Sequence, residues 1–282
     1  MRKEVPLILD KKNDKMFLID QYRFSDPAFK ITVTATAGQI FTIPLKVGYS
    51  YNFTANWGDG TADSTITAYN DADISHTYTN AGNYQISMVG LIQYFGFIGV
   101  GSRLMLKSID AWGNIGIIAC DRAFDGCSNL TTLPLGKLTW IPTNTGSSGG
   151  YYRLFTSCTK LASIPVDFFD LAVNVQSFVN TFWECFLIPS IPNNLLYNCA
   201  GAIYYSGTFR SCRFLVLPTS IFNLANLSIT TTFANFMDVD ATSRSPTGTI
   251  QDIWNYTTAT STDAFDQCTA ITNYASIPGA WT

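Results

Sequence analysis

The chain has 282 residues, of which 47% are apolar, 14% aromatic and only 13% charged, and its formal net charge is −3. This length can bury a large core and is sufficient for two domains. A mildly acidic chain argues against nucleic acid as the main partner, because phosphate binding needs a basic stripe. With so few charges, Ser, Thr and Asn must supply most of the soluble surface, as in β-rich proteins on the outside of cells or particles.

Residues 1–29 are predicted to form an extended arm. Residues 1–30 hold seven of the 17 Lys and Arg residues, with little periodicity beyond Met16–Ile19. The longest apolar run, Val5–Leu9, is too short for a secretory signal. Two interpretations stay open: a frayed terminus, or a tether that becomes ordered against a neighbouring subunit.

Alternation of apolar and polar residues predicts strands from Lys30 onward, with turns at 37–39 and at Gly58-Asp59-Gly60. The residues expected to face the core are Ile31, Val33, Ala35, Ile40, Thr42, Pro44, Tyr51, Phe53, Ala55, Trp57, Tyr84, Ile86 and Met88. The apolar stretch 86–101 is too short to span a membrane and holds four glycines, so a pair of buried strands is expected there. About sixty residues of this kind indicate a small β-sandwich.

Three motifs follow one another in this region: WGDGT at 57–61, HTY at 76–78 and AGNY at 81–84. In this order they resemble the polycystic-kidney-disease (PKD) type of immunoglobulin-like domain. The resemblance covers about residues 30–100 and implies a sandwich used as a spacer or adhesion module. Its motif residues are Trp57, Gly58, Asp59, Gly60, His76 and Tyr78. We expect Asp59 to cap the turn and His76 to lie in a turn, bonded to nearby backbone.

The second half of the chain repeats a Phe followed three residues later by a Cys. Five units carry both residues: Phe124 and Cys127, Phe155 and Cys158, Phe182 and Cys185, Phe209 and Cys212, and Phe265 and Cys268. A further unit, TFANF, is aligned with Phe233 as the repeat Phe and Phe236 at the Cys position. Self-similarity with spacings of 24 to 32 residues predicts a solenoid, in which each turn buries its apolar face against its neighbours.

The seven cysteines are predicted to be small buried hydrophobic residues. Their number is odd, no C-x-x-C occurs, and five of them occupy one repeat position, which disfavours disulfides and metal ligation. The alignment of Phe236 with that position supports this interpretation, because Phe can replace a buried apolar group but not a ligand.

The units from 101 to 282 resemble BspA-type leucine-rich repeats, whose units also read F-x-x-C-x-x-L-x-x-(I/L)-P. The resemblance implies a short strand, a proline turn and a helical or 3₁₀ return segment in each unit. The expected fold is therefore mainly β: the arm (1–29), an immunoglobulin-like sandwich (30–100), and an irregular leucine-rich-repeat-like solenoid with short helices (101–282).

The sequence contains few residues suited to general acid–base catalysis, because His76 is the one histidine and Glu184 is the one Glu after Glu4. The pairs Asp71/Asp73 and Asp238/Asp240 suit calcium but equally suit solvated loops. We therefore expect no enzyme, no cofactor and no metal site.

Adjacent tyrosines are the best candidates for a binding surface, because neighbouring rings in a strand cannot both point inward. These candidates are Tyr151, Tyr152, Tyr204 and Tyr205.

The function expected from these features is that of a non-catalytic structural protein on the exterior of a phage virion, as a capsid decoration or part of a tail-fibre or adhesion apparatus. The arm would bind other virion proteins, and the repeats would face a host glycan or protein, or a neighbouring subunit of an oligomer. Nucleic-acid binding and membrane insertion are not expected. Two alternatives stay open: a bacterial cell-surface adhesin and a carbohydrate-binding accessory module.

Overall fold

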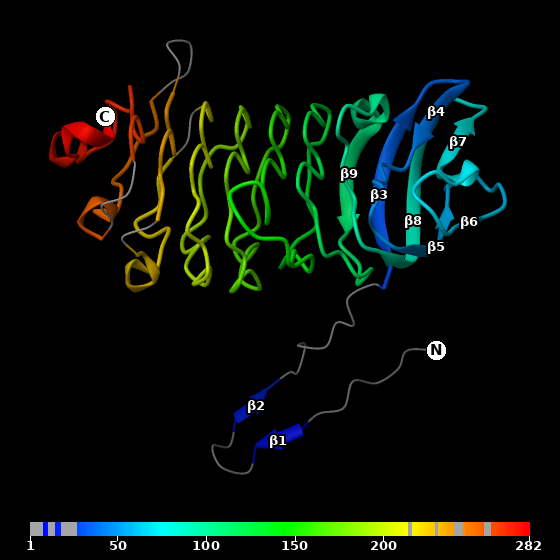
Figure 1. Ribbon diagram of the computed structural model, residues 1–282, viewed down its shortest axis with the longest axis horizontal. Helices are drawn as coiled ribbons and strands as arrows, with labels where there is room; N and C mark the ends of the chain where they lie inside the picture. The colour runs from blue at the N-terminus through cyan, green and yellow to red at the C-terminus, as the bar shows by residue number, and fades with distance from the viewer. Residues whose placement is uncertain are drawn as a thin grey trace.

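The computed structural model describes residues 8–10, 15–17, 27–213, 216–228, 231–239, 245–256 and 261–282. This part of the chain is mainly β, with antiparallel sheets at one end and a row of stacked turns running to the C-terminus (Figure 1). It contains no α-helix, only the 3₁₀ helices η2 (Ala72–Ile74), η3 (Gly101–Met105), η4 (Leu224–Asn226), η5 (Ile253–Asn255), η6 (Tyr274–Ser276) and η7 (Gly279–Trp281). No helix within the described ranges is long and apolar enough to cross a membrane.

Three sheets contain all the named strands. A five-stranded antiparallel sheet has the order β6-β5-β8-β3-β9, and two further two-stranded sheets are β4-β7 and β1-β2. The bounds are β1 (Ile8–Asp10), β2 (Lys15–Phe17), β3 (Phe29–Ala35), β4 (Gln39–Thr42), β5 (Tyr51–Asn56), β6 (Ser64–Ile66), β7 (Ser75–Tyr78), β8 (Gly82–Ile92) and β9 (Leu106–Ala111).

The predicted inward faces of β3 and β5 are confirmed, and Ile86 and Met88 of β8 are buried as well. Of the residues predicted to face the core at 40–44, Pro44 is buried, but Ile40 is 56% exposed and the inward residues are instead Phe41 and Ile43. Apolar residues occur in both alternating sets of this segment, one with Ile40 and Pro44 and the other with Phe41 and Ile43. The set with Phe41 faces the core because its larger side chain removes more apolar area from water. The expected pair of strands at 86–101 is also wrong: β8 continues to Ile92, and an irregular segment follows.

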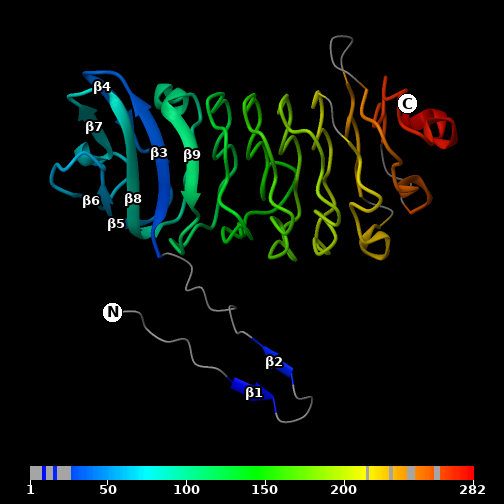
Figure 2. The ribbon, with the colours of Figure 1, turned by 180° about the vertical axis from the view of Figure 1, so that it is seen from behind.

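The sheet is joined to the stacked turns by hydrogen bonds. Strand β9 lies beyond the boundary expected at residue 100, and it pairs with β3. On its other side the Ile109 amide donates to the Thr132 carbonyl at 3.1 Å, and Ser108 forms a parallel bridge with Thr132. Buried side chains form one continuous core along both parts, which lie side by side in a single row (Figure 2). At the other end, Phe29 is fully buried in β3, so the expected arm must end before it.

Each stacked turn contains an eight-residue segment, which we call an octet, running from four residues before the repeat position to three after it. The octets are 120–127, 151–158, 178–185, 205–212, 233–240 and 261–268, with residue 240 outside the described part. Within that part the first, fourth, fifth and eighth residues of every octet are buried. The fifth residues include Phe124, Phe155, Phe182 and Phe209, whose rings stack at centroid distances of 5.4 to 5.5 Å.

Backbone hydrogen bonds hold each octet on the next. In octet 178–185 the amides of the first, third, fifth and seventh residues donate to carbonyls of the next turn, at 2.8 to 3.0 Å. These bonds are Phe178 to Tyr204, Asn180 to Ser206, Phe182 to Thr208 and Glu184 to Arg210. The third and seventh residues of this octet, Asn180 and Glu184, have left-handed φ of 55° and 61°. This conformation costs about 1–2 kcal/mol for a residue other than glycine, and the inter-turn bonds help to offset it.

The hydrogen-bond register overturns the predicted alignment of the fifth unit. Phe209 donates to the carbonyl of Phe236, and Met237 donates to that of Ala264, so Met237 takes the repeat position. Phe233 belongs instead to the first octet position, below Tyr205, where the rings stack at 5.2 Å. Phe236 therefore occupies the fourth position and does not replace a cysteine. The residue at that cysteine position is Asp240, outside the described residues.

The cysteines are free and buried, as predicted, but they also donate hydrogen bonds. The Sγ atoms of Cys158, Cys185 and Cys212 lie 3.0 to 3.1 Å from the carbonyl oxygen of the repeat Phe one turn earlier. Burial raises the pKa of Cys212 to about 12, against the smaller opposing effect of its hydrogen bond with Cys185. The thiol therefore stays protonated as a donor.

The predicted strands and helices of each repeat are mostly absent from the described turns. Single parallel bridges such as Ser190 with Val216 replace the strands, and helical geometry in the return segments is limited to η4 and η5. Amides of the return segment bond to the next turn, as Leu196 does to Ile221 at 3.0 Å. These bonds compete with the local bonds a helix would need.

Replacement of Phe182 tests whether the stacked rings at the fifth octet position stabilise the fold. We expect Phe182→Ala to lower the free energy of unfolding by about 3–5 kcal/mol, because it opens a cavity between two stacked rings. Chemical denaturation measures this loss. Phe186→Ala is the control, because Phe186 is only half-buried beside Arg213 and should cost about 1 kcal/mol or less. Equal losses of stability in Phe182→Ala and Phe186→Ala would contradict a stabilising role of the stacked rings.

Replacement of Gln267 tests the energetic cost of the left-handed φ at the seventh octet position. Gln267 is exposed with a φ of 57°, so Gln267→Gly should stabilise the protein by roughly 0.5–1 kcal/mol. The neighbouring Asp266, which lacks a positive φ, gives the control: Asp266→Gly should destabilise by a similar amount. Thermal unfolding of both variants measures the two signs, and two losses of stability would refute the conformational argument.

Candidate functional site

The second, third, sixth and seventh residues of the octets point away from the stacked rings, and we call them the octet face. Most of them are half-buried or exposed, whereas Thr156, Gly207, Ser211 and Val239 are buried. The middle of the octet face is rich in arginine and aromatic residues: Arg153 lies 5.5 Å from the ring centre of Trp183, and Arg210 lies 5.7 Å from the same ring. Trp and Arg are the residues most enriched among binding hot spots, so this is the strongest candidate binding surface.

Two ion pairs fix these arginines. Arg153 Nε lies 3.1 Å from Asp125 Oδ2, and Arg210 Nε lies 3.0 Å from Asp238 Oδ2. Burial raises the pKa of both carboxyl groups and outweighs the opposing effect of the arginines. The two ion pairs hold the guanidinium groups of Arg153 and Arg210 against the stack, so these groups do not move freely in solvent.

The four predicted tyrosines divide into two inward and two outward side chains. Tyr151 is fully buried and donates its hydroxyl to the carbonyl of Trp140, and Tyr205 is buried between Phe178 and Phe233. Neither can form a surface contact, so their assignment as binding residues is wrong.

The outward member of each tyrosine pair stays a candidate. Tyr152 is half-buried on the octet face, and Arg122 lies 5.7 Å from its ring centre, while Tyr204 is half-buried directly before octet 205–212. The structure therefore brings Tyr152 close to the arginines that sequence reasoning did not select.

The single histidine contacts the WGDGT motif of the sheet region. His76 lies in β7, and its Nε2 is 2.7 Å from Asp59 Oδ2, which corrects the expected bond to backbone. Its ring stacks on Trp57 at 4.9 Å, and Tyr78 donates its hydroxyl to the Trp57 carbonyl.

The WGDGT turn has the expected cap. The Thr61 amide and hydroxyl both donate to Asp59 Oδ1, at 3.1 and 2.6 Å. Gly58 has a φ of 78°, and a Cβ there would overlap the backbone of Gln85, so glycine is required. Together these contacts make the motif a structural anchor.

The aspartate pairs do not gather into a metal site. Asp71 accepts hydrogen bonds from the amides of Asp73 and Thr67 and begins η2. Asp238 is paired with Arg210, while Asp240 lies outside the described residues. Across the ranges described above, no group of three or more His, Cys, Asp or Glu side chains is placed to hold a metal ion.

Comparisons with protein-family models, curated proteins and solved structures found no match for this chain.

Acid unfolding tests the role of Asp59. Although burial opposes ionisation, hydrogen bonds from Thr61 and His76 lower the pKa of Asp59 from 3.8 to about 2. A carboxyl group with a lowered folded-state pKa stabilises the fold above its unfolded pKa, and this stability is lost as the pH falls from about 4 to 2. Melting curves of Asp59→Asn should therefore depend less on pH in this window than those of the wild type. The exposed Asp73 gives the control Asp73→Asn, and identical pH dependence in Asp59→Asn and wild type would rule out the contribution.

Proposed function

We propose that the protein is a non-catalytic structural component on the exterior of a phage particle, decorating the head or forming part of the tail adhesion apparatus. In this proposal the first region is a PKD-type immunoglobulin-like sandwich and the stacked turns are a leucine-rich-repeat-like solenoid. The sandwich acts as a spacer, and the solenoid presents the octet face to a host surface or to a neighbouring subunit.

The observation that carries the proposal is the division between the inside and the outside of the octets. The cysteines, the repeat phenylalanines and the inward tyrosines are used in packing and in bonds between turns. Arg153, Trp183 and Arg210 lie on the outside of this rigid frame. A rigid frame carrying aromatic and arginine side chains suits recognition, because little conformational entropy is lost on binding.

The tether is the second part of the proposal. Residues 1–26 are rich in Lys and Asp and precede the buried start of β3 at Phe29. They can bind another virion protein without disturbing the core. The oligomeric state in the particle would follow from that attachment.

Two alternatives use the same surface in another setting. A bacterial cell-surface adhesin would present it from the cell envelope, and a carbohydrate-binding module would present it beside an enzyme. Cell fractionation separates the first alternative from the proposal, because an adhesin would fractionate with the envelope of uninfected cells.

Removal of residues 1–26 tests the proposed location. Antibodies against the protein should label purified particles in electron microscopy, and the truncated protein should fold but fail to join the particle. Unfolding of the truncated protein should match that of the full chain, because the deletion stops before Phe29. Absence of label on particles containing the full chain would contradict the proposal, and normal incorporation of the truncated chain would contradict the tether.

A further inference from the structure

The stack is open between the segment after β8 and the first octet. The Phe97 amide donates to the Ala123 carbonyl at 3.2 Å, the register in which repeat phenylalanines bond to the next octet. Gly99 has a φ of 69°, like the seventh residue of an octet. The described residues nevertheless show no bond from Gly99 to Asp125, where the register would place one. The chain instead turns away into η3.

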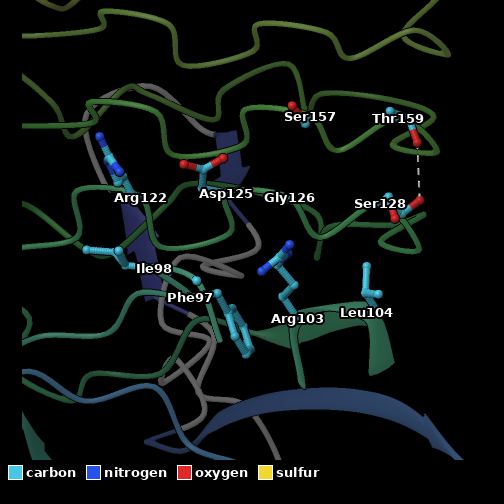
Figure 3. Close-up of a pocket in the computed structure, with 11 residues that line it drawn as sticks. Phe97, Ile98, Arg103, Leu104, Arg122, Asp125, Gly126, Ser128, Ser157 and Thr159 are labelled. Carbon is cyan, nitrogen blue, oxygen red and sulfur yellow. Dashed lines mark hydrogen bonds between the residues drawn. The ribbon is translucent and has the colours of Figure 1, made fainter. Parts of the chain in front are cut away.

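This opening is a hollow of about 480 Å³, shown in Figure 3. Its volume lies within the range of pockets that hold small molecules. Arg103 reaches from η3 toward Gly126, which has no side chain to block it: a Cβ on Gly126 would lie 2.9 Å from Arg103 Nε. Arg122 lines the hollow from the first octet.

Positive charge exceeds negative charge around the hollow. The guanidinium groups of Arg103, Arg122 and Arg153 all act on the single carboxylate of Asp125. Asp125 pairs with Arg153, and no carboxylate of the described residues lies within 4.0 Å of Arg103 or Arg122. In the lining itself Arg103 and Arg122 carry two positive charges and Asp125 carries one negative charge, which leaves a local excess of one; Arg153, the partner of Asp125, lies outside the lining.

The remaining lining residues supply both hydroxyl groups and apolar atoms, which are the two kinds of group that contact a sugar ring. The Ser128 and Thr159 side chains bring hydroxyl groups, while Ile98 and Leu104 are 43% and 50% exposed at its wall. Apolar wall atoms suit the C–H face of a pyranose ring, and hydroxyls pair with its hydroxyls. An arginine fork binds a carboxylate through two charge-assisted hydrogen bonds.

We propose that this hollow binds a carboxylate-bearing sugar unit of an acidic polysaccharide. Arg103 binds the carboxylate, Arg122 adds its positive charge from the other side of the hollow, and the Ser128 and Thr159 hydroxyls bind the ring hydroxyls. This inference rests on the proposed function, for which it names the ligand class. Its test uses purified protein, so a failure of particle labelling and a failure of sugar binding are separate results.

Ligand-observed NMR titration with sodium glucuronate, glucose, acetate and inorganic phosphate tests the site. Glucuronate should bind more tightly than the other three. Arg103→Gln should weaken glucuronate binding about tenfold or more, because it removes the charge-assisted bonds to the carboxylate. Arg122→Gln should weaken it less, by about threefold, because it removes a nearby charge. Asp125→Asn should strengthen binding, because it removes the negative charge next to the ligand.

Arg213→Gln is the matched control, because Arg213 lies outside both the octet face and the lining of the hollow. It should change the affinity by less than about twofold, within the additivity expected of distant sites. The proposal is overturned if glucuronate does not bind, if glucose, acetate or phosphate binds equally well, or if the control weakens binding as much as the two lining variants. Unfolding curves of all four variants identify any loss of fold.

Discussion

The backbone hydrogen bonds between successive octets are the constraint on which the rest of the structure depends. They require that every second amide points along the stack, as those of Phe178, Asn180, Phe182 and Glu184 do. They also require left-handed residues at two positions of most octets, at a local cost of about 1–2 kcal/mol each. Once these positions are set, the inward and outward residues of each turn are determined.

This geometry explains why residues that suggest chemistry in the sequence belong to the interior. The cysteine thiols donate between turns, and the Thr181 hydroxyl lies within hydrogen-bonding distance of the carbonyls of Tyr151 and Phe178. Buried polar groups need such partners. The stack supplies them, and the proposed recognition therefore rests on the outward residues Arg153, Trp183 and Arg210.

Much of the fold could be predicted from spacing, but not the exact register. The Phe-x-x-Cys period identified four consecutive turns, whereas Phe233 and Phe236 mimicked that spacing and only hydrogen bonds revealed Met237 as the repeat residue. Alternation indicated that one tyrosine of each adjacent pair faces outward without deciding which. The hollow could not be predicted, because it depends on a bond that Gly99 does not make.

A density map of the intact particle by electron cryomicroscopy tests the central claim most directly. That claim is that the stack exists to present its octet face on the particle exterior. The account predicts density for residues 27–282 on the outer surface, with Arg153, Trp183 and Arg210 directed toward solvent or an adjoining subunit. Absence of the chain from the outer surface, or an octet face covered by the underlying shell protein, would contradict it.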